Sequence, residues 1–277
     1  KIILAAQSGS LGYDDIIRNV FNIKVVSPFH HKITTLLPPT LIEFRSKFAL
    51  LKSDPEFSVV IPTYNRKDSL KRALNSILGQ LEIKNSAFEI IIIDDNSTDN
   101  TKDEIQKFIA AEGENTSIIY AKLSKNSGSQ IARNLGIMLA RGSYIAFTDD
   151  DCVVPADWII NFKRAFGKHP EIVGVGGCKN FGYSQNSKTM DAYERFLFWK
   201  KYPYMQNEWK SNTFDAFNQC GDTANVCYKR TTLLELEGFN PFFRRFGHWE
   251  LKVRIHKKQY SLLYHLHHVK HFSQKSF

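Results

Sequence analysis

The chain has 277 residues, of which 43% are hydrophobic and 13% aromatic, and its formal net charge is +9. This composition is typical of a globular protein with a packed core and excludes a disordered chain. No apolar run approaches the ~20 residues that a membrane-spanning helix needs. The four cysteines contain no CxxC pair, which favours free thiols and a cytoplasmic location.

Positive charge is concentrated at the end of the chain, where residues 228–277 contain ten Lys and Arg against three Glu. A basic surface of this kind either attracts an anionic partner or is an ordinary solvated face. If it attracts a partner, we expect the protein to make peripheral contact with the inner face of an anionic membrane. No RNA-binding signature with interleaved aromatic residues is present, so no nucleic acid is expected as a partner.

Strands and helices alternate between residues 54 and 155. The predicted strands are 57–61, 88–93, 117–123 and 143–148, and helical apolar spacing follows the first three of them at 70–78, 105–109 and 131–139. Continuous apolar strands separated by helices predict an α/β fold with a doubly wound, mostly parallel sheet.

The alternation ends after residue 155. There we expect helices at 156–166, 231–237 and 249–258, strands at 172–176 and 225–228, and a helix with loops at 193–209. Residues 1–53 are predicted to form an appendage, with strands at 2–5 and 23–26 and a helix at 41–48. We therefore divide the chain into an appendage (1–53), a first half (54–155) and a second half (156–277).

Polar clusters follow three of the four predicted strands of the first half. They are the segments 62–66, 94–97 and 149–151, and the remaining strand ends near 126–128, at the start of the helix that bears Arg133. In open parallel sheets, ligands bind in the crevice beyond the carboxyl ends of the strands. We therefore expect these clusters to line one crevice.

Asp149, Asp150 and Asp151 are three adjacent carboxylates at the end of a predicted buried strand. They repel one another, and burial would raise their pKa values further. A divalent cation removes this conflict, and hard oxygen ligands suit Mg²⁺ or Mn²⁺. The alternative is an acidic turn that leads into the next helix. The position at the end of a buried strand favours the metal site.

Asp94 and Asp95 allow two interpretations as well. A carboxylate at this position could accept hydrogen bonds from a nucleobase or a ribose hydroxyl, or it could cap the following helix. We expect residues 96–98 to cap the helix and Asp95 to bind. In the first loop, Tyr64 offers a ring to a base, unless it packs as loop core, and Arg66 offers a charge to a phosphate. Neither GxGxxG nor GxxxxGK[ST] follows the first strand, which excludes a dinucleotide fold and a P-loop.

Four segments together carry a family resemblance: VVIPTYNR (59–66), IIIIDDNSTDNT (90–101), NSGSQIARNLG (126–136) and SYIAFTDDDCVVPADW (143–158). In order and spacing they resemble glycosyltransferase family 2, the inverting enzymes of the GT-A fold, over about residues 57–271. The resemblance implies a Rossmann-like nucleotide-sugar-binding half followed by an acceptor-binding half. It further implies metal-dependent transfer from a nucleotide diphosphate donor, favouring a UDP-sugar, to a glycan, lipid-linked or other hydroxyl acceptor in cell-envelope polysaccharide biosynthesis.

The resemblance also implies individual roles. The residues expected to contact the nucleotide are Pro62, Thr63, Tyr64, Arg66, Asp94, Asp95, Arg133, Asp149 and Asp150. The metal-binding DXD pair of the family corresponds to Asp149 and Asp151, while Asp150 would face the donor sugar. His271 lies where family members often have a late histidine that reaches the metal or the diphosphate. Gly221 and Asp222 belong to the segment that shapes the acceptor side.

The chain departs from the family pattern in GFNPFFRRFGHWEL (238–251). Family members usually carry a Glu-Asp pair here, and its Asp is the catalytic base, but this chain has Gly247 and His248. A base is needed because the acceptor hydroxyl loses its proton as it attacks. His248 and Glu250 are the candidates. The alternatives are a catalytically impaired sugar-nucleotide-binding protein and a nucleotidyltransferase, although the latter usually needs a Gly- and Lys/Arg-rich loop after the first strand.

Overall fold

The computed structural model describes residues 41–47, 54–83, 87–111, 116–181, 209–211, 222–243 and 247–272. In these residues one ten-stranded sheet has the order β1-β4-β3-β2-β5-β9-β7-β10-β6, and β8 pairs with β10. None of the helices in these segments combines the length and the hydropathy that crossing a bilayer requires.

The strands are β1 Leu41–Lys47, β2 Phe57–Thr63, β3 Phe88–Asp94, β4 Ser117–Leu123, β5 Tyr144–Phe147, β6 Cys152–Val153, β7 Ile172–Phe181, β8 Trp209–Ser211, β9 Val226–Lys229 and β10 Ser261–His271. The helices are α4 Lys67–Leu78, α5 Thr101–Ala111, α6 Ser129–Leu139, α7 Trp158–Lys168, α10 Arg230–Glu235 and α11 Gly247–Lys257.

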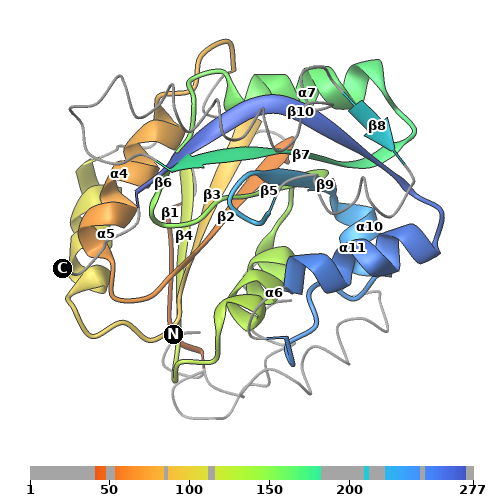
Figure 1. Ribbon diagram of the computed structural model, residues 1–277. Helices are drawn as coiled ribbons and strands as arrows, with labels where there is room; N and C mark the ends of the chain where they lie inside the picture. The colour runs from red at the N-terminus through yellow and green to blue at the C-terminus, as the bar shows by residue number, and fades with distance from the viewer. Residues whose placement is uncertain are drawn as a thin grey trace.

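Helices cover both faces of the sheet (Figure 1). Apolar residues of α4, α5 and α7 pack in one core cluster, and those of α6, α10 and α11 pack in the other. Strands β4, β3, β2 and β5 run parallel to one another, and every residue of β2 and β3 is buried. The structure therefore confirms the predicted α/β fold and its four parallel strands, because strands buried on both faces carry continuous apolar runs.

Helix α6 lies especially close to β2. A Cβ atom added to Gly136 would come within 2.3 Å of Cγ1 of Val60. Glycine at this position therefore lets the helix backbone approach the sheet. This close packing fixes the beginning of α6 near the carboxyl end of β2, where the polar clusters meet.

The helix predicted at 41–48 is wrong. Residues Leu41–Lys47 form β1, which pairs antiparallel with β4 from Leu41↔Leu123 to Lys47↔Ile118. Without this strand, β4 would present unpaired N–H and C=O groups at the edge of the sheet. The pairing joins segments about 75 residues apart, so local sequence preference does not reveal it. The strands predicted at 2–5 and 23–26 lie outside the described residues.

The second half contributes the antiparallel strands β8 and β9 and the parallel pair β7 and β10, and β10 also pairs antiparallel with the short strand β6 at the end of the first half. β9 pairs antiparallel with both β5 and β7, whereas β7 and β10 run parallel. The strands predicted at 172–176 and 225–228 are confirmed as β7 and β9, and β7 extends further. Residues 193–208 of the segment predicted as a helix with loops lie outside the described residues. The last residue of that segment, Trp209, begins β8. Strand β10, which the sequence patterns did not predict, ends at the acidic cluster.

Candidate active site

The carboxyl ends of the parallel strands form a crevice of about 510 Å³. It collects residues from four loops, the start of α6 and the end of β10. Its lining is Pro62, Thr63, Tyr64, Arg66, Asp95, Asn126, Gly128, Ser129, Arg133, Asp149, Asp150, Asp151 and His271. The structure thus brings together almost all of the residues that the sequence assigned to nucleotide and metal. Ser129 was not predicted, although its position after a strand end is the signal that would have identified it.

One arginine joins two carboxylates of the acidic cluster. Arg66 Nη1 donates to Asp150 Oδ1 at 3.0 Å and to Asp151 Oδ2 at 2.6 Å. The Thr63 hydroxyl donates to the other oxygen of Asp150 at 2.8 Å. Burial raises the pKa of Asp150 to about 6, although Arg66 and Thr63 both act to lower it. Asp150 is therefore held in place from two sides.

A second arginine reaches the same cluster from α6. Arg133 Nη2 donates to Asp149 Oδ1 at 2.8 Å, and the Arg133 guanidinium lies 5.9 Å from the centre of the Phe239 ring. Phe239 packs edge-on against Phe147 of β5, with ring centroids 5.3 Å apart. Both Arg133 and the strand that leads to the aspartates are thus supported by one aromatic residue of the second half.

His271 completes the crevice from β10. Its Nε2 lies 3.3 Å from Asp151 Oδ1, because β10 pairs with β6 in the register His271↔Cys152. The Phe272 N–H also donates to the carbonyl oxygen of Asp151 at 2.8 Å. Burial acts to raise the pKa of Asp151, but the hydrogen bond with His271 and the charge of Arg66 outweigh it, so this pKa is lowered.

The donor atoms at this edge fit a hard divalent cation. Asp149, Asp151 and Cys152 each place one ligand atom within 4.8 Å of the others. Burial raises the pKa of the Cys152 thiol, so the carboxylates rather than a thiolate are the available ligands. Two carboxylates with an adjacent histidine suit Mn²⁺ or Mg²⁺. Cys152 and Cys227 are free thiols, as the sequence predicted.

Asp94 and Asp95 differ sharply in their surroundings. Asp95 lines the crevice and accepts the N–H groups of Ser127 at 2.6 Å and Gly128 at 2.8 Å. Burial raises the pKa of Asp95 in spite of these two donors. Asp94 is fully buried, lies outside the crevice lining, and accepts hydrogen bonds from the Ser97 N–H and the Tyr120 hydroxyl. Asp95 therefore holds the beginning of α6, whereas Asp94 holds its own loop.

The cap predicted at 96–98 is wrong. Helix α5 begins at Thr101, and Asp99 accepts both the N–H and the hydroxyl of Thr101. Asp99 also accepts the Lys67 N–H at 3.2 Å, so this carboxylate joins the starts of two helices. Residues 96–98 instead lead from the strand into this turn.

The loop after β2 is held in a defined shape by Asn65. Its φ angle is +53°, and its side-chain oxygen accepts the Thr98 N–H at 2.7 Å. The Asn65 N–H in turn donates to the hydroxyl of Ser97 at 2.9 Å. Tyr64 is 45% exposed, so the alternative that its ring packs as loop core is wrong. Its side chain remains available to a ligand at the rim.

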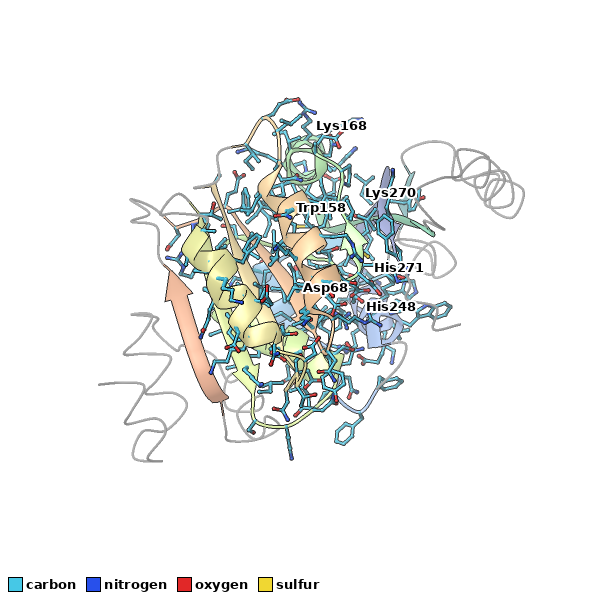
Figure 2. All side chains as sticks on the ribbon, turned by 90° about the vertical axis from the view of Figure 1, so that its left-hand side faces the viewer. Asp68, Trp158, Lys168, His248, Lys270 and His271 are labelled. Carbon is cyan, nitrogen blue, oxygen red and sulfur yellow. The ribbon has the colours of Figure 1, made fainter. Side chains whose placement is uncertain are left out.

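The two base candidates lie in the first turn of α11, outside the lining of the crevice. Glu250 accepts two hydrogen bonds from Arg254, both at 2.7 Å, and lines a second cavity of about 610 Å³. In Figure 2, His248 and His271 lie on the same flank of the molecule. Gly221 falls outside the described residues, and Asp222 accepts the Ala224 N–H at 2.9 Å in its own turn, away from the crevice lining.

Two side-chain amides of α6 connect the first half to the segment 238–247. Asn134 donates to the Phe239 carbonyl at 2.7 Å and accepts the Phe239 N–H at 2.8 Å. One turn earlier, the amide of Gln130 lies against Gly247, where an added Cβ would come within 2.5 Å. Gly238, with a φ of +64°, is equally close to Asn134. We call the Asn134–Phe239 and Gln130–Gly247 contacts the α6 latch. The second contact places the residue just before His248 against the helix that bears Arg133.

Parallel strands with a polar crevice at their carboxyl edge, as in β4, β3, β2 and β5, are typical of α/β proteins that bind nucleotides. The sequence model described as glycosyl transferase family 2 matches residues 58–226. This range is more than half of the chain, and the chain belongs to this family.

Relatives named as glycosyltransferases agree with this assignment. The chain is 31% identical over 143 residues to the glycosyltransferase AglE of Haloferax volcanii. The aligned region covers 51% of this chain and 45% of that protein. It is 32% identical over 163 residues to the putative colanic acid biosynthesis glycosyl transferase WcaA of Escherichia coli, covering 54% and 55%. The matched part is thus about half the length of these relatives.

Solved structures show the same fold. The structure of Staphylococcus aureus TarS 1-349 in complex with UDP-GlcNAc aligns with a TM-score of 0.63 and 15% identity, covering 80% of this chain and 60% of that one. The mannosyltransferase PcManGT from Pyrobaculum calidifontis, in complex with GDP-Man and Mn²⁺, aligns with a TM-score of 0.63 and 16% identity, covering 99% and 69%. The GT-A fold expected from the sequence is therefore confirmed.

Proposed function

We propose that this chain is a metal-dependent inverting glycosyltransferase that moves a sugar from a nucleotide diphosphate donor, a UDP-sugar, to a hydroxyl acceptor. One observation carries the proposal: two arginines and three aspartates meet in a crevice at the carboxyl edge of a family 2 fold. Anionic donors need cations beside them, and the crevice supplies both guanidinium groups and metal ligands.

In this proposal Asp149 and Asp151, with His271 beside them, hold Mn²⁺ or Mg²⁺. The bound cation would offset the charge that develops on the leaving diphosphate. Arg66 and Arg133 add positive charge near the same group. Complexes of the fold relatives support this choice of ligand, because they contain UDP-GlcNAc in one case and GDP-Man with Mn²⁺ in the other.

The remaining crevice residues would position the donor. Tyr64 offers its exposed ring to the base, and Pro62 and Thr63 shape the wall of the nucleoside pocket. Asp95 would contact the nucleoside from the loop that it anchors. Asp150, held by Thr63 and Arg66, would face the donor sugar. Asp94 would act indirectly, since both of its oxygens already accept protein hydrogen bonds.

We assign the base to His248 rather than Glu250. Glu250 is held by Arg254 through both oxygens and lines the other cavity, whereas the α6 latch brings the residue before His248 to the start of α6. A ring nitrogen of neutral His248 would take the acceptor hydroxyl proton as that oxygen attacks the anomeric carbon. The bond to the diphosphate breaks on the opposite face, which inverts the anomeric centre.

We propose a glycan or a lipid-linked glycan as the acceptor, at the cytoplasmic face of a membrane. Relatives named for colanic acid, for teichuronic acid and for poly(ribitol-phosphate) support a role in cell-surface polymers. In this division of labour, residues 54–155 bind the donor and residues 156–277 bind the acceptor, including Gly221 and Asp222. Residues 1–53 contribute at least β1, which extends the sheet.

A sugar-nucleotide-binding protein without turnover is the second candidate. The observation in its favour is that Gly247 and His248 replace the Glu-Asp pair of the family. It would bind the same donors at the same crevice and would differ from the enzyme only in turnover.

The test is a panel of nucleotide sugars offered to the purified protein with Mn²⁺. We expect one donor class to raise the melting temperature only with metal present and to be hydrolysed slowly without an acceptor. Stabilisation without hydrolysis, and without transfer to added glycan acceptors, would favour the binding protein. No stabilisation by any donor, with or without metal, would contradict both candidates.

A further inference from the structure

The carboxylates of the acidic cluster at residues 149–151 already have partners within the protein. Groups from four residues contact at least five of the six carboxylate oxygens within 3.3 Å: Thr63, Arg66, Arg133 and His271. With a neutral histidine, three carboxylates and two guanidinium groups leave a formal charge of −1. A divalent cation that binds to this cluster must therefore share oxygens with an arginine or displace it.

The two arginines differ in how firmly they are held. The side chain of Arg133 is 6% exposed and lies against the Phe239 ring, so it is fixed by packing. The side chain of Arg66 is 43% exposed and contacts both of its carboxylates through the single nitrogen Nη1. Ion pairs that remain partly in water contribute little to stability. Arg66 can therefore turn from the carboxylates to another anion by side-chain rotation alone.

The carboxylate that Arg66 contacts most closely is also one of the two expected metal ligands. Asp151 directs Oδ2 to Arg66 at 2.6 Å and Oδ1 to His271 at 3.3 Å. A cation bound through Asp151 would therefore lie beside the guanidinium group. Even with the screening of bulk water, a divalent and a monovalent charge about 4 Å apart repel each other by roughly tenfold or more in an equilibrium constant. Arg66 thus opposes the binding of a bare divalent cation.

The same guanidinium group has the opposite effect on a nucleoside diphosphate. Arg66 lines the crevice together with Arg133, and the planar fork of an arginine binds phosphate oxygens with two parallel hydrogen bonds. A nucleoside diphosphate carries more negative charge than one divalent cation neutralises, so the complex of the two is still an anion. Arg66 therefore disfavours the metal alone and favours the metal together with the diphosphate.

We propose that Arg66 is a positioning residue that makes metal binding depend on the donor. It holds Asp150 and Asp151 against a bare divalent cation, and it turns to the diphosphate when metal and donor bind together. The proposal deepens the proposed function and rests on it for the identity of the donor. Its first half concerns the metal alone, so it is tested without any nucleotide.

The first experiment is a titration of the full chain with Mn²⁺ alone, in which electron paramagnetic resonance measures the free ion. Arg66→Met removes the charge and keeps an unbranched side chain, and we expect it to bind Mn²⁺ about tenfold more tightly than the wild type or tighter still. Arg66→Gln, a second neutral variant, should behave alike, whereas Arg66→Lys keeps the charge and should stay near the wild type. The matched control is Arg164→Met, which removes a guanidinium group paired with Glu82 on α7, outside the crevice lining. It should leave the Mn²⁺ affinity unchanged.

The second experiment is calorimetry with UDP at saturating Mn²⁺. Here Arg66→Met should bind UDP about tenfold more weakly, because a charge-assisted hydrogen bond to the diphosphate is lost. Opposite changes in the two affinities identify the proposed role, since damage to the fold of the crevice would weaken both. Thermal melts of all variants accompany the titrations.

The proposal would be overturned by a Mn²⁺ affinity that is equal or weaker in the neutral variants, or by the absence of Mn²⁺ binding in the wild type and the variants alike. Unchanged UDP affinity in Arg66→Met would also overturn it. Equal binding of UDP to the wild type with and without Mn²⁺ is a different result. It would contradict the metal dependence of the proposed function, while the titration with Mn²⁺ alone would still decide whether Arg66 opposes the cation.

Discussion

The crevice and the segment 238–250 are positioned in two different ways. The crevice residues lie directly after strands of one parallel sheet, so the topology alone brings them to a common edge. In the segment 238–250, the described residues Phe239 and Gly247 contact side chains of α6 more than 100 residues away in the sequence, above all through the hydrogen bonds of Asn134 with Phe239. Changes in the first region should therefore alter ligand binding, whereas changes in the second should alter turnover and stability.

The largest expected effect is on turnover at His248. If His248 is the base, His248→Ala should lower the transfer rate ~10²–10⁴-fold and leave UDP affinity unchanged, because the base touches the acceptor. Initial rates and calorimetry with Mn²⁺ and UDP measure the two quantities. His256→Ala, in the same helix, is the matched control. Near-wild-type turnover in His248→Ala would remove this residue from the mechanism, and loss in Glu250→Gln alone would transfer the role to Glu250.

The next largest effect is on donor binding at the acidic cluster. Asp151→Asn removes a metal-binding charge, and we expect UDP affinity in Mn²⁺ to fall by roughly 100-fold, about the loss that even indirect damage to a metal site can cause. Asp68→Asn makes the same change on the exposed surface of α4 (Figure 2) and should have no effect. Calorimetry with and without EDTA is the measurement. Equal UDP affinity with and without EDTA would contradict metal-dependent donor binding.

Breaking the α6 latch at Asn134 should mainly lower the free energy of unfolding. Asn134→Ala leaves the buried N–H and C=O of Phe239 without partners, which costs about 2–3 kcal/mol of the free energy of unfolding. The melting temperature should fall by about 5–10 °C. Turnover should fall as the segment 238–250 loosens, while UDP affinity stays near wild type. Asn75→Ala, on the exposed face of α4, is the control. A large loss of UDP affinity in Asn134→Ala would show that the two regions are not separable.

The smallest effect distinguishes two carboxylates in one loop. Asp95→Ala should weaken UDP binding about tenfold, the value of a buried charged hydrogen bond, and also lower the melting temperature, because Ser127 and Gly128 lose their acceptor. Asp99→Ala removes the acceptor of N–H groups at the starts of α4 and α5 and should cost about 1–2 kcal/mol of stability without changing UDP affinity. Calorimetry and thermal melts on both variants compare them. Similar UDP affinities in the two variants would limit Asp95 to a structural role.

The first half of the chain could be predicted well because its signals are local. Runs such as 90–93 are apolar throughout, since strands of a covered parallel sheet are buried on both faces. Polar residues placed directly after such runs then converge by topology. This reasoning predicts that Asp95 and Asp149 lie at one edge of the sheet, and both line the crevice.

Besides the short strands β6 and β8, the two long strands β1 and β10 escaped prediction for a physical reason. Strand β1 depends on the free edge of β4, and β10 depends on β7, about 90 residues earlier. Strand pairing of this kind draws its stability from distant N–H and C=O groups rather than from residue preference. The role proposed for His271 rests on family resemblance alone, because the approach of His271 to Asp151 requires the register of β10 on β6.

The sequence by itself determined the family, the parallel core and the residues at the carboxyl edge, because each depends on local runs of residues and on the order in which these runs follow one another along the chain. Only the tertiary structure shows that Asp94 and Asp95 differ in their surroundings: Tyr120 donates to Asp94, outside the crevice lining, and Gly128 donates to Asp95, within it. It likewise separated Glu250, held by Arg254, from the crevice. In both cases the hydrogen bond that makes the difference depends on how the folded chain brings side chains together. The spacing of residue types along the sequence does not reveal such contacts.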